Sequence, residues 1–269
     1  MNQRPLPAGV GTGLRVRYTT NAITIYALIS SILFIVCFAL ARFPNISRPM
    51  VRWINSFSGK SKFIDSVITD LAFYFIFSGV LLCGILYAYW LSSRDPELRS
   101  RIFIGIFASF GAGVISRYLQ HHLSTNVRPY FDSAVAFQNP RGMTNPQFNQ
   151  WDSFPSDHSA VFVGLVVVLF VIKSRIRYPV AVWIAIVESS RIFIGEHFPL
   201  DLVGGACLAS TVVWIFQYPP FIRAGGWCCA WEFRAPILFH TLFFISLYEV
   251  STLFGDVRSM SHALNGGLQ

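Results

Sequence analysis

Long apolar runs, separated by short polar segments, set the pattern of this chain. Two uncharged runs, residues 23–41 and 71–91, each match the roughly 20 residues that an α-helix needs to cross a bilayer. Shorter or polar-interrupted runs cover residues 102–120, 156–172, 180–195 and 202–216, and a last run, 236–254, contains His240 and Glu249. The pattern predicts an all-α, polytopic membrane helix bundle with six core transmembrane helices and a seventh near the C-terminus.

The composition favours a membrane protein over a soluble domain. Of the 269 residues, 54% are hydrophobic and 13% are charged, and the mean hydropathy is +0.52. The net charge of +8 does not indicate nucleic-acid binding, because the basic residues are scattered between the apolar runs. The five cysteines lack the spacing of zinc ligands or of a disulfide framework, so we expect neither a metal site nor a structural disulfide.

One membrane domain accounts for the chain. We expect a cytoplasmic leader at residues 1–22, a six-helix core at 23–218 and an extension at 219–269 that holds the extra helix. Residues 23–41 exceed the apolar part of a usual signal peptide, so a retained helix is favoured over a cleaved one. Basic residues in the leader and after the second and fourth runs favour an N-terminus inside the cell, although the loop 43–70 is also basic. Within that loop, residues 57–68 are amphipathic and could lie along the interface.

Side chains that can carry chemistry concentrate in three segments. These are residues 121–129 after the third run, 154–158 at the start of the fourth, and 190–201 around the turn between the fifth and sixth. Because successive membrane helices alternate in direction, all three segments are expected at one face of the membrane. With the N-terminus inside, this is the outer face. In a bacterium, the site would face the periplasm or the exterior from the inner membrane.

The residues of these segments suit chemistry on phosphate. Arg128 and Arg191 are planar, permanent cations that match phosphate oxygens, and Ser156 adds a hydroxyl donor. Pro155 and Pro199 are expected at the first positions of two helices. The free N–H groups of those helix ends would point into one anion site.

Two histidines and a carboxylate complete the predicted mechanism. Asp201, about one turn after His197, can accept a hydrogen bond from one ring nitrogen and leave the other free to attack phosphorus. His158, in the first turn of the facing helix, could protonate the leaving group. We expect no metal and no cofactor, because the arginines and helix ends supply the positive charge.

These residues resemble the signature of the type 2 phosphatidic acid phosphatase superfamily, which reads K-x6-R-P, P-S-G-H and S-R-x5-H-x3-D. The third part is complete here, the second reads PSDH at residues 155–158, and the first has His121 ahead of Arg128-Pro129. The resemblance implies that His197 forms a phosphohistidine, that His158 acts as the acid and that Asp201 orients the nucleophile. It also implies that phosphate is bound by Arg128, Ser156 and Arg191.

Two positions depart from that signature. His121 replaces the lysine and would contact phosphate fully only when protonated, so its role stays open, and the neighbouring His122 competes for it. Asp157 replaces the glycine. Its backbone N–H remains available to phosphate, but its carboxylate must point away or be paired. The PSDH form is similar to undecaprenyl-pyrophosphate phosphatases of the bacitracin-resistance type, which favours a polyprenyl diphosphate as substrate.

The sequence therefore predicts a metal-independent hydrolase that acts on a lipid phosphate or polyprenyl diphosphate and contacts membrane lipid. Two alternatives stay open: a phosphotransferase that passes the phosphoryl group to a second lipid, and a non-catalytic lipid transporter or scaffold. The loop 130–154 is expected to cover the pocket. Arg117 is either a partner of the groups that bind phosphate or an interfacial anchor, and the anchor is favoured. Glu188 is interpreted as a polar contact between helices. Glu196 either tunes His197 or lies in solvent.

Overall fold

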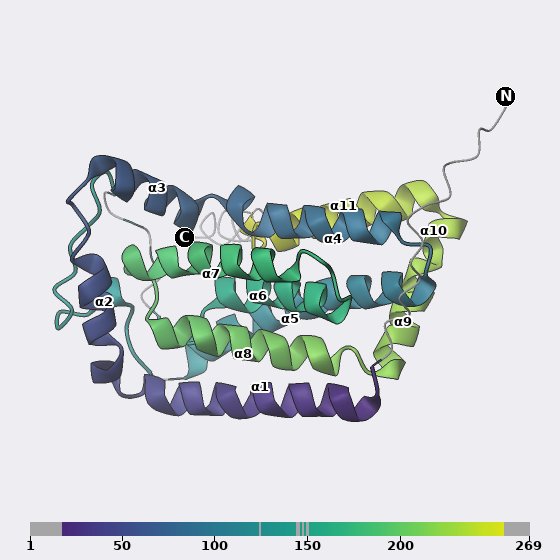
Figure 1. Ribbon diagram of the computed structural model, residues 1–269, viewed down its shortest axis with the longest axis horizontal. Helices are drawn as coiled ribbons and strands as arrows, with labels where there is room; N and C mark the ends of the chain where they lie inside the picture. Colours follow the sequence, from purple (N-terminus) through teal and green to yellow (C-terminus); the bar gives the residue numbers. More distant parts are fainter. Residues whose placement is uncertain (1–17, 124, 144–145, 147, 149–150, 256–269) are drawn as a thin grey trace, which may run out of the picture.

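The computed structural model describes residues 18–123, 125–143, 146, 148 and 151–255, and the regular secondary structure within these is entirely helical, with no strand. The longer helices lie side by side along the long axis of the molecule (Figure 1). They are α1 (Thr20–Ala41), α4 (Gly79–Ser92), α5 (Pro96–His122), α6 (Asp157–Val171), α7 (Arg177–Phe193), α8 (Pro199–Ile215) and α11 (Pro236–Ser251). The predicted all-α bundle is confirmed.

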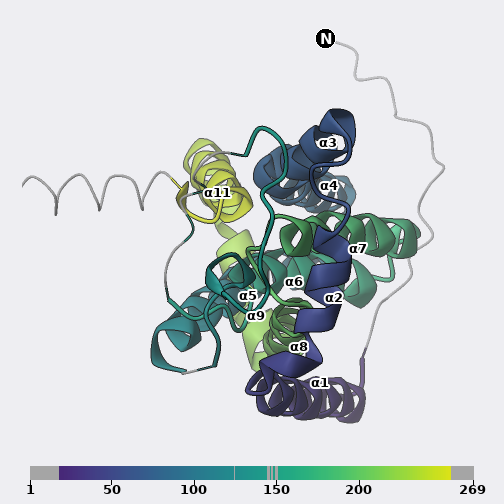
Figure 2. The same ribbon diagram turned by 90° about the vertical axis from the view of Figure 1, so that its left-hand side faces the viewer.

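Helix α6 lies at the centre of the bundle. It contacts α4, α5, α7 and α8, while α1 packs against α8 at one side and α11 against α4 at the other (Figure 2). Most residues of α6 are buried, as expected for a helix that is apolar on every side. The close approach of α5 to α6 depends on Gly113, where an added Cβ would collide with the side chain of Val161.

Short helices cover the two ends of the bundle (Figure 1). Helices α2 (Arg48–Asn55) and α3 (Lys62–Phe73) lie at one end, and α9 (Pro219–Cys229) and α10 (Trp231–Arg234) lie at the other. Single turns occur at η1 (Pro44–Ile46), η2 (Phe75–Phe77) and η3 (Pro129–Phe131). The predicted amphipathic segment 57–68 does not form one continuous helix. It comprises a turn and the first half of α3.

The predicted second span, residues 71–91, is interrupted. Helix α3 ends at Phe73, Tyr74 has an extended backbone with φ −89° and ψ 110°, and α4 begins only at Gly79. At its new start α4 lies close to the end of α11, since an added Cβ at Gly79 would collide with the carbonyl oxygen of Ser251. The apolar run continues through the break, so hydropathy does not reveal it.

Among the residues that the structure describes, three segments are long and apolar enough to cross a membrane: α1, residues 75–92, and α5. A fourth is possible if α8 and the helices after it, bent by 78°, form one span, and α6 and α11 are shorter apolar helices. These features support an integral membrane protein, while the count of six or seven crossings stays a prediction. Helix α5 also begins earlier than predicted, because its first two turns are charged and start at Pro96 behind the N-cap Asp95.

Side chains of helix α2 hold the long loop between α5 and α6 in place. The guanidinium of Arg48 contacts the carboxylate of Asp132 at 2.8 Å. Asn55 donates to the carbonyl oxygen of Gln138 at 2.8 Å and accepts from its N–H at the same distance. Residues 125–143 are thereby held at the end of the bundle where the three predicted site segments also lie.

Candidate active site

His197 is fully buried in the turn between α7 and α8. Its Nδ1 lies 3.0 Å from the carbonyl oxygen of Ser153, and its Nε2 lies 3.4 Å from Nη1 of Arg128. A carbonyl oxygen can only accept, so in the neutral ring the proton sits on Nδ1 and the lone pair on Nε2. The ring therefore presents a nucleophilic nitrogen beside a guanidinium, which is the arrangement needed for attack on a bound phosphate.

Asp201 lies next to the His197 ring, and its carboxylate also accepts a hydrogen bond at the start of α8. Its Oδ2 is 3.7 Å from Nδ1 of His197, and the same oxygen accepts the backbone N–H of Phe198 at 2.7 Å, at the start of α8. The carbonyl oxygen of Ser153 is the nearer acceptor for His197. Residue identity gives no sign of such a contact, because every residue carries a backbone carbonyl.

Two buried arginines share one carboxylate next to His197. Nη1 of Arg191 lies 2.6 Å from Oε2 of Glu196, and Nη1 of Arg128 lies 3.7 Å from Oε1 of the same group. Burial alone would raise the pKa of the Glu196 carboxyl, but the Arg191 guanidinium and the other positive groups around it hold that pKa well below its ordinary value. Glu196 is therefore buried and ionised, not solvated, and it holds the two arginines where a phosphate can bind.

A second chain of contacts reaches His158. Nη2 of Arg117 lies 2.5 Å from Oδ2 of Asp157, and Oδ1 of Asp157 lies 3.0 Å from Nδ1 of His158. The rings of His158 and His197 are 6.5 Å apart between centroids. The Asp157 carboxylate is thus paired, as its place in the motif requires, and Arg117 is an ion-pair partner of the site, not only an interfacial anchor.

The helix ends meet as the topology predicts, with one correction. Ser156 caps α6, because its Oγ accepts the N–H of Ser159 at 3.3 Å, and its own N–H donates to the carbonyl oxygen of Asp201 at 3.0 Å. The starts of α6 and α8 are therefore joined. Pro199 occupies the first position of α8, as predicted, but Pro155 does not begin α6, whose N-cap is Ser156. Pro155 instead offers its carbonyl oxygen to Ser116 Oγ of α5, at 2.9 Å.

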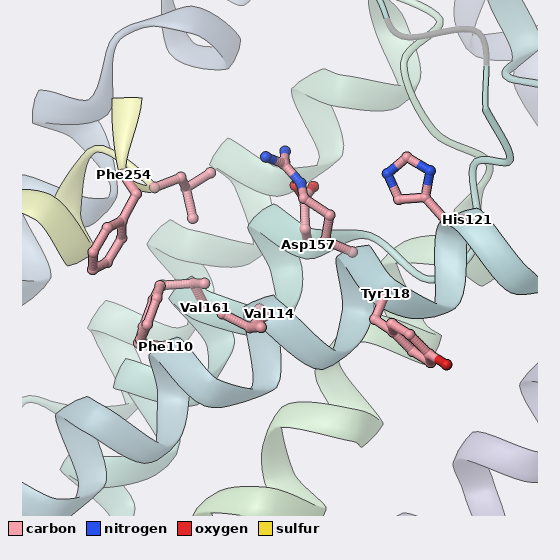
Figure 3. Close-up of a pocket in the computed structure, with 10 residues that line it drawn as sticks. Phe110, Val114, Tyr118, His121, Asp157, Val161 and Phe254 are labelled. Atoms are coloured by element: carbon pink, nitrogen blue, oxygen red, sulfur yellow. The ribbon is translucent and has the colours of Figure 1, made fainter. Parts of the chain in front are cut away.

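His121 lies apart from this cluster. It is exposed at the end of α5, and its ring centroid is 4.2 Å from that of Trp151. In the described part of the chain, its contacts do not include His197 or either buried arginine. His121 instead lines a groove beside Arg117 and Asp157 (Figure 3).

Three of the site residues have atoms close enough to hold a metal ion. Ligand atoms of Asp157, His158 and His197 all lie within 4.8 Å of one another. The guanidinium groups of Arg128 and Arg117, in contact with His197 and Asp157, oppose a cation there. The cluster suits an anion better, because buried guanidinium groups and a histidine Nε2 converge on one point.

The fold and this cluster define a class, an integral membrane helix bundle with a cluster of histidines and arginines suited to an anion at one end. Residues 101–223, somewhat less than half of the chain, match the model of the PAP2 superfamily, so this segment is similar to the family that the motifs indicated. This segment runs from the start of α5 to α9 and contains every predicted site residue. The match supports the predicted class of enzyme, a membrane lipid phosphatase.

Two curated relatives are similar to the chain. Undecaprenyl-diphosphatase BcrC of Bacillus subtilis (strain 168) is 24% identical over 163 residues, which is 61% of this chain and 78% of the relative. Bacitracin transport permease protein BcrC of Bacillus licheniformis is 25% identical over 179 residues, which is 66% of this chain and 83% of the relative. No solved structure matches the chain significantly.

Proposed function

We propose that this protein hydrolyses a polyprenyl diphosphate, with undecaprenyl diphosphate as the favoured substrate, through a phosphohistidine formed on His197. The observation that carries the proposal is the orientation of the buried His197 ring, with Nδ1 held by the Ser153 carbonyl and Nε2 directed at Arg128. The similarity to a relative named as an undecaprenyl-diphosphatase, together with the PSDH form of the motif, supports the choice of substrate.

The proposed reaction has two steps. Nε2 of His197 attacks the terminal phosphorus, the bond to the bridging oxygen breaks, and His158 gives its proton to the departing lipid monophosphate. Water then attacks the phosphohistidine, His158 accepts a proton from that water, and inorganic phosphate leaves with His197 restored. Arg128 and Arg191 bind the phosphoryl oxygens in both steps, where fixed charges in a buried site stabilise the developing charge.

The other proposed phosphate contacts are weaker. Ser156 and the backbone N–H groups at the start of α6, including that of Asp157, can donate to an oxygen. His121 contributes only if the diphosphate extends toward the groove that it lines. Asp201 steadies the turn through its bond to Phe198 and lies 3.7 Å from His197, close enough to stabilise a charged ring.

We also propose that the site faces outward. The basic segments after α4 and α6 lie at the end of the bundle opposite the site (Figure 1). The positive-inside rule places that end in the cytoplasm. In this arrangement residues 23–218 form the phosphatase core, residues 219–269 form an extension, and a bacterial chain would act at the outer side of the inner membrane.

The test is to trap the intermediate. Purified protein given undecaprenyl diphosphate and denatured at alkaline pH should carry one phosphoryl group on the peptide that contains His197. His197→Ala should release no phosphate and carry no label. His240→Ala is the matched control, because that ring lies in α11 against Tyr87 and should leave the rate unchanged. Phosphate release by His197→Ala at the normal rate would overturn the proposal.

A further inference from the structure

A groove of about 400 Å³ runs along α5 between that helix, the start of α6 and the residues that follow α11. Figure 3 shows its side chains, with His121 and Asp157 toward one end and Phe110 and Phe254 toward the other. The apolar side chains of its wall are Phe110, Val114, Val161, Leu253 and Phe254. From the 1.5 Å rise per residue of an α-helix, the stretch of α5 between Phe110 and His121 is about 16 Å long.

The polar end of the groove leads directly to the candidate active site. Arg117 and Asp157 line the groove and form an ion pair at 2.5 Å. The same Asp157 carboxylate holds Nδ1 of His158 at 3.0 Å, and His158 is the proposed acid. A molecule whose phosphate reaches the histidines can therefore extend its apolar part along this wall.

The opposite end is closed by the extension that follows the family match. The rings of Phe254 and Phe110 stack with centroids 4.1 Å apart. Residues 253 and 254 are positioned by the end of α11, where the Ser251 carbonyl packs on Gly79 of α4. Helix α11 lies beyond residues 101–223, so this part of the wall does not belong to the matched segment.

We infer that this groove binds the first isoprene units of the substrate's prenyl chain and that residues 253–254 set how much of the chain it covers. The inference rests on the proposed function and names the substrate's apolar subsite. The groove has one apolar wall, which extends about 16 Å along α5. A single narrow wall of this length fits the start of one prenyl chain better than the two chains of a phospholipid, and the rest of a long chain lies in the bilayer.

The test fills the groove without touching the catalytic residues. Val114 lines the groove and is 51% exposed, whereas its neighbour Ile115 is 41% exposed and is not part of the wall. Val114→Trp should raise KM for farnesyl diphosphate at least tenfold and leave kcat/KM for p-nitrophenyl phosphate within twofold. Ile115→Trp, the matched control, should change neither value. Equal effects of Val114→Trp on both substrates, or no effect on either, would overturn the inference.

A second variant tests the closed end. Phe254→Ala removes the ring that meets Phe110 and should raise KM for the C15 diphosphate several-fold. The C10 diphosphate, which does not fill the groove, should be affected less. Equal changes for the two chain lengths would exclude a role of residue 254 in covering the chain.

A binding measurement separates this inference from the proposed reaction. A prenyl diphosphate analogue with a photoreactive group on its second isoprene unit is cross-linked to His197→Ala protein, which needs no turnover. Labelled peptides that contain residues 110–118 or 253–254 would support the groove even if the wild-type protein released no phosphate. Labelling confined to other helices would overturn the groove, whatever the activity.

Discussion

The contact between Asp157 and His158 gives the sharpest prediction about the mechanism. Asp157→Asn keeps the shape of the side chain but removes the charge that holds Nδ1 of His158 at 3.0 Å and pairs with Arg117 at 2.5 Å. With Nδ1 held by Asp157, the proton that His158 gives to the leaving oxygen is on Nε2 of the protonated ring. A neutral amide at position 157 no longer stabilises the positive charge of that ring, so less of the acid form is present.

The size of the effect follows from the kind of hydrogen bond that is lost. A hydrogen bond to a charged group contributes about 1.5–3 kcal/mol. If this contribution is made in the transition state, at about 1.4 kcal/mol for each factor of ten, kcat falls about 10- to 150-fold. The loss should depend on the substrate, because p-nitrophenolate leaves without a proton and a lipid monophosphate leaves more easily with one.

The assay compares phosphate release from farnesyl diphosphate and from p-nitrophenyl phosphate. Asp157→Asn should lose activity on the first and keep most of it on the second. Asp132→Asn is the matched control, because Asp132 is also a buried carboxylate paired with an arginine, at 2.8 Å from Arg48, but it lies in the loop that α2 fastens. Equal losses on the two substrates would show that Asp157 supports folding only, and this would refute the proton-donor reasoning.

Two further predictions concern stability. Gly205→Ala should lower the melting temperature in detergent and reduce activity, because its Cβ would collide with the Ser156 carbonyl and lie 3.0 Å from Cβ of Ser159, and overpacking costs about 1–3 kcal/mol. Gly111→Ala, with nothing within 4 Å of its added Cβ, should not destabilise the protein, and similar losses in both variants would contradict this packing. Because the pKa of Glu196 is lowered in the folded state, its carboxylate stabilises the protein above the unfolded pKa of about 4.3 and loses this effect as pH falls below it. Glu196→Gln should therefore melt lower at neutral pH and lose less stability on acidification below pH about 4, and parallel melting curves would contradict the ion pair.

The elements that sequence predicts best are those that local pattern determines. Helix α1 agrees with the predicted run at residues 23–41 within three residues at its start, because nothing in that stretch competes with an apolar helix. The break at residues 74–78 is different. It lies next to the close approach of Gly79 to the end of α11, a contact across more than 170 positions of the chain, and the local hydropathy does not change there.

The candidate site also has a part that the sequence predicts and a part that it does not. Alternating helix direction was enough to bring His158 and His197 to one end, and the rings lie 6.5 Å apart. The acceptor for His197 was not predictable, because it is the backbone carbonyl of Ser153. The pairing of Arg117 with Asp157 spans 40 positions, and a residue one turn before His121 has no local feature that separates an ion-pair partner from an interfacial anchor.

The two departures from the family signature are connected through Arg117. A lysine and a glycine at the signature positions would leave two positive charges, the lysine and Arg117, without the Asp157 carboxylate as a partner. Here the carboxylate of Asp157 neutralises Arg117, one turn before His121, and His121 itself lies exposed against Trp151. In the proposed reaction, phosphate binding would therefore depend on Arg128 and Arg191, and less of the affinity would come from charge. An apolar groove that begins at this same ion pair offers a second source of affinity, because burial of a prenyl chain contributes about 25 cal/mol for each Å² removed from water. A protein of this design should discriminate between substrates by their lipid chains more strongly than by their phosphates.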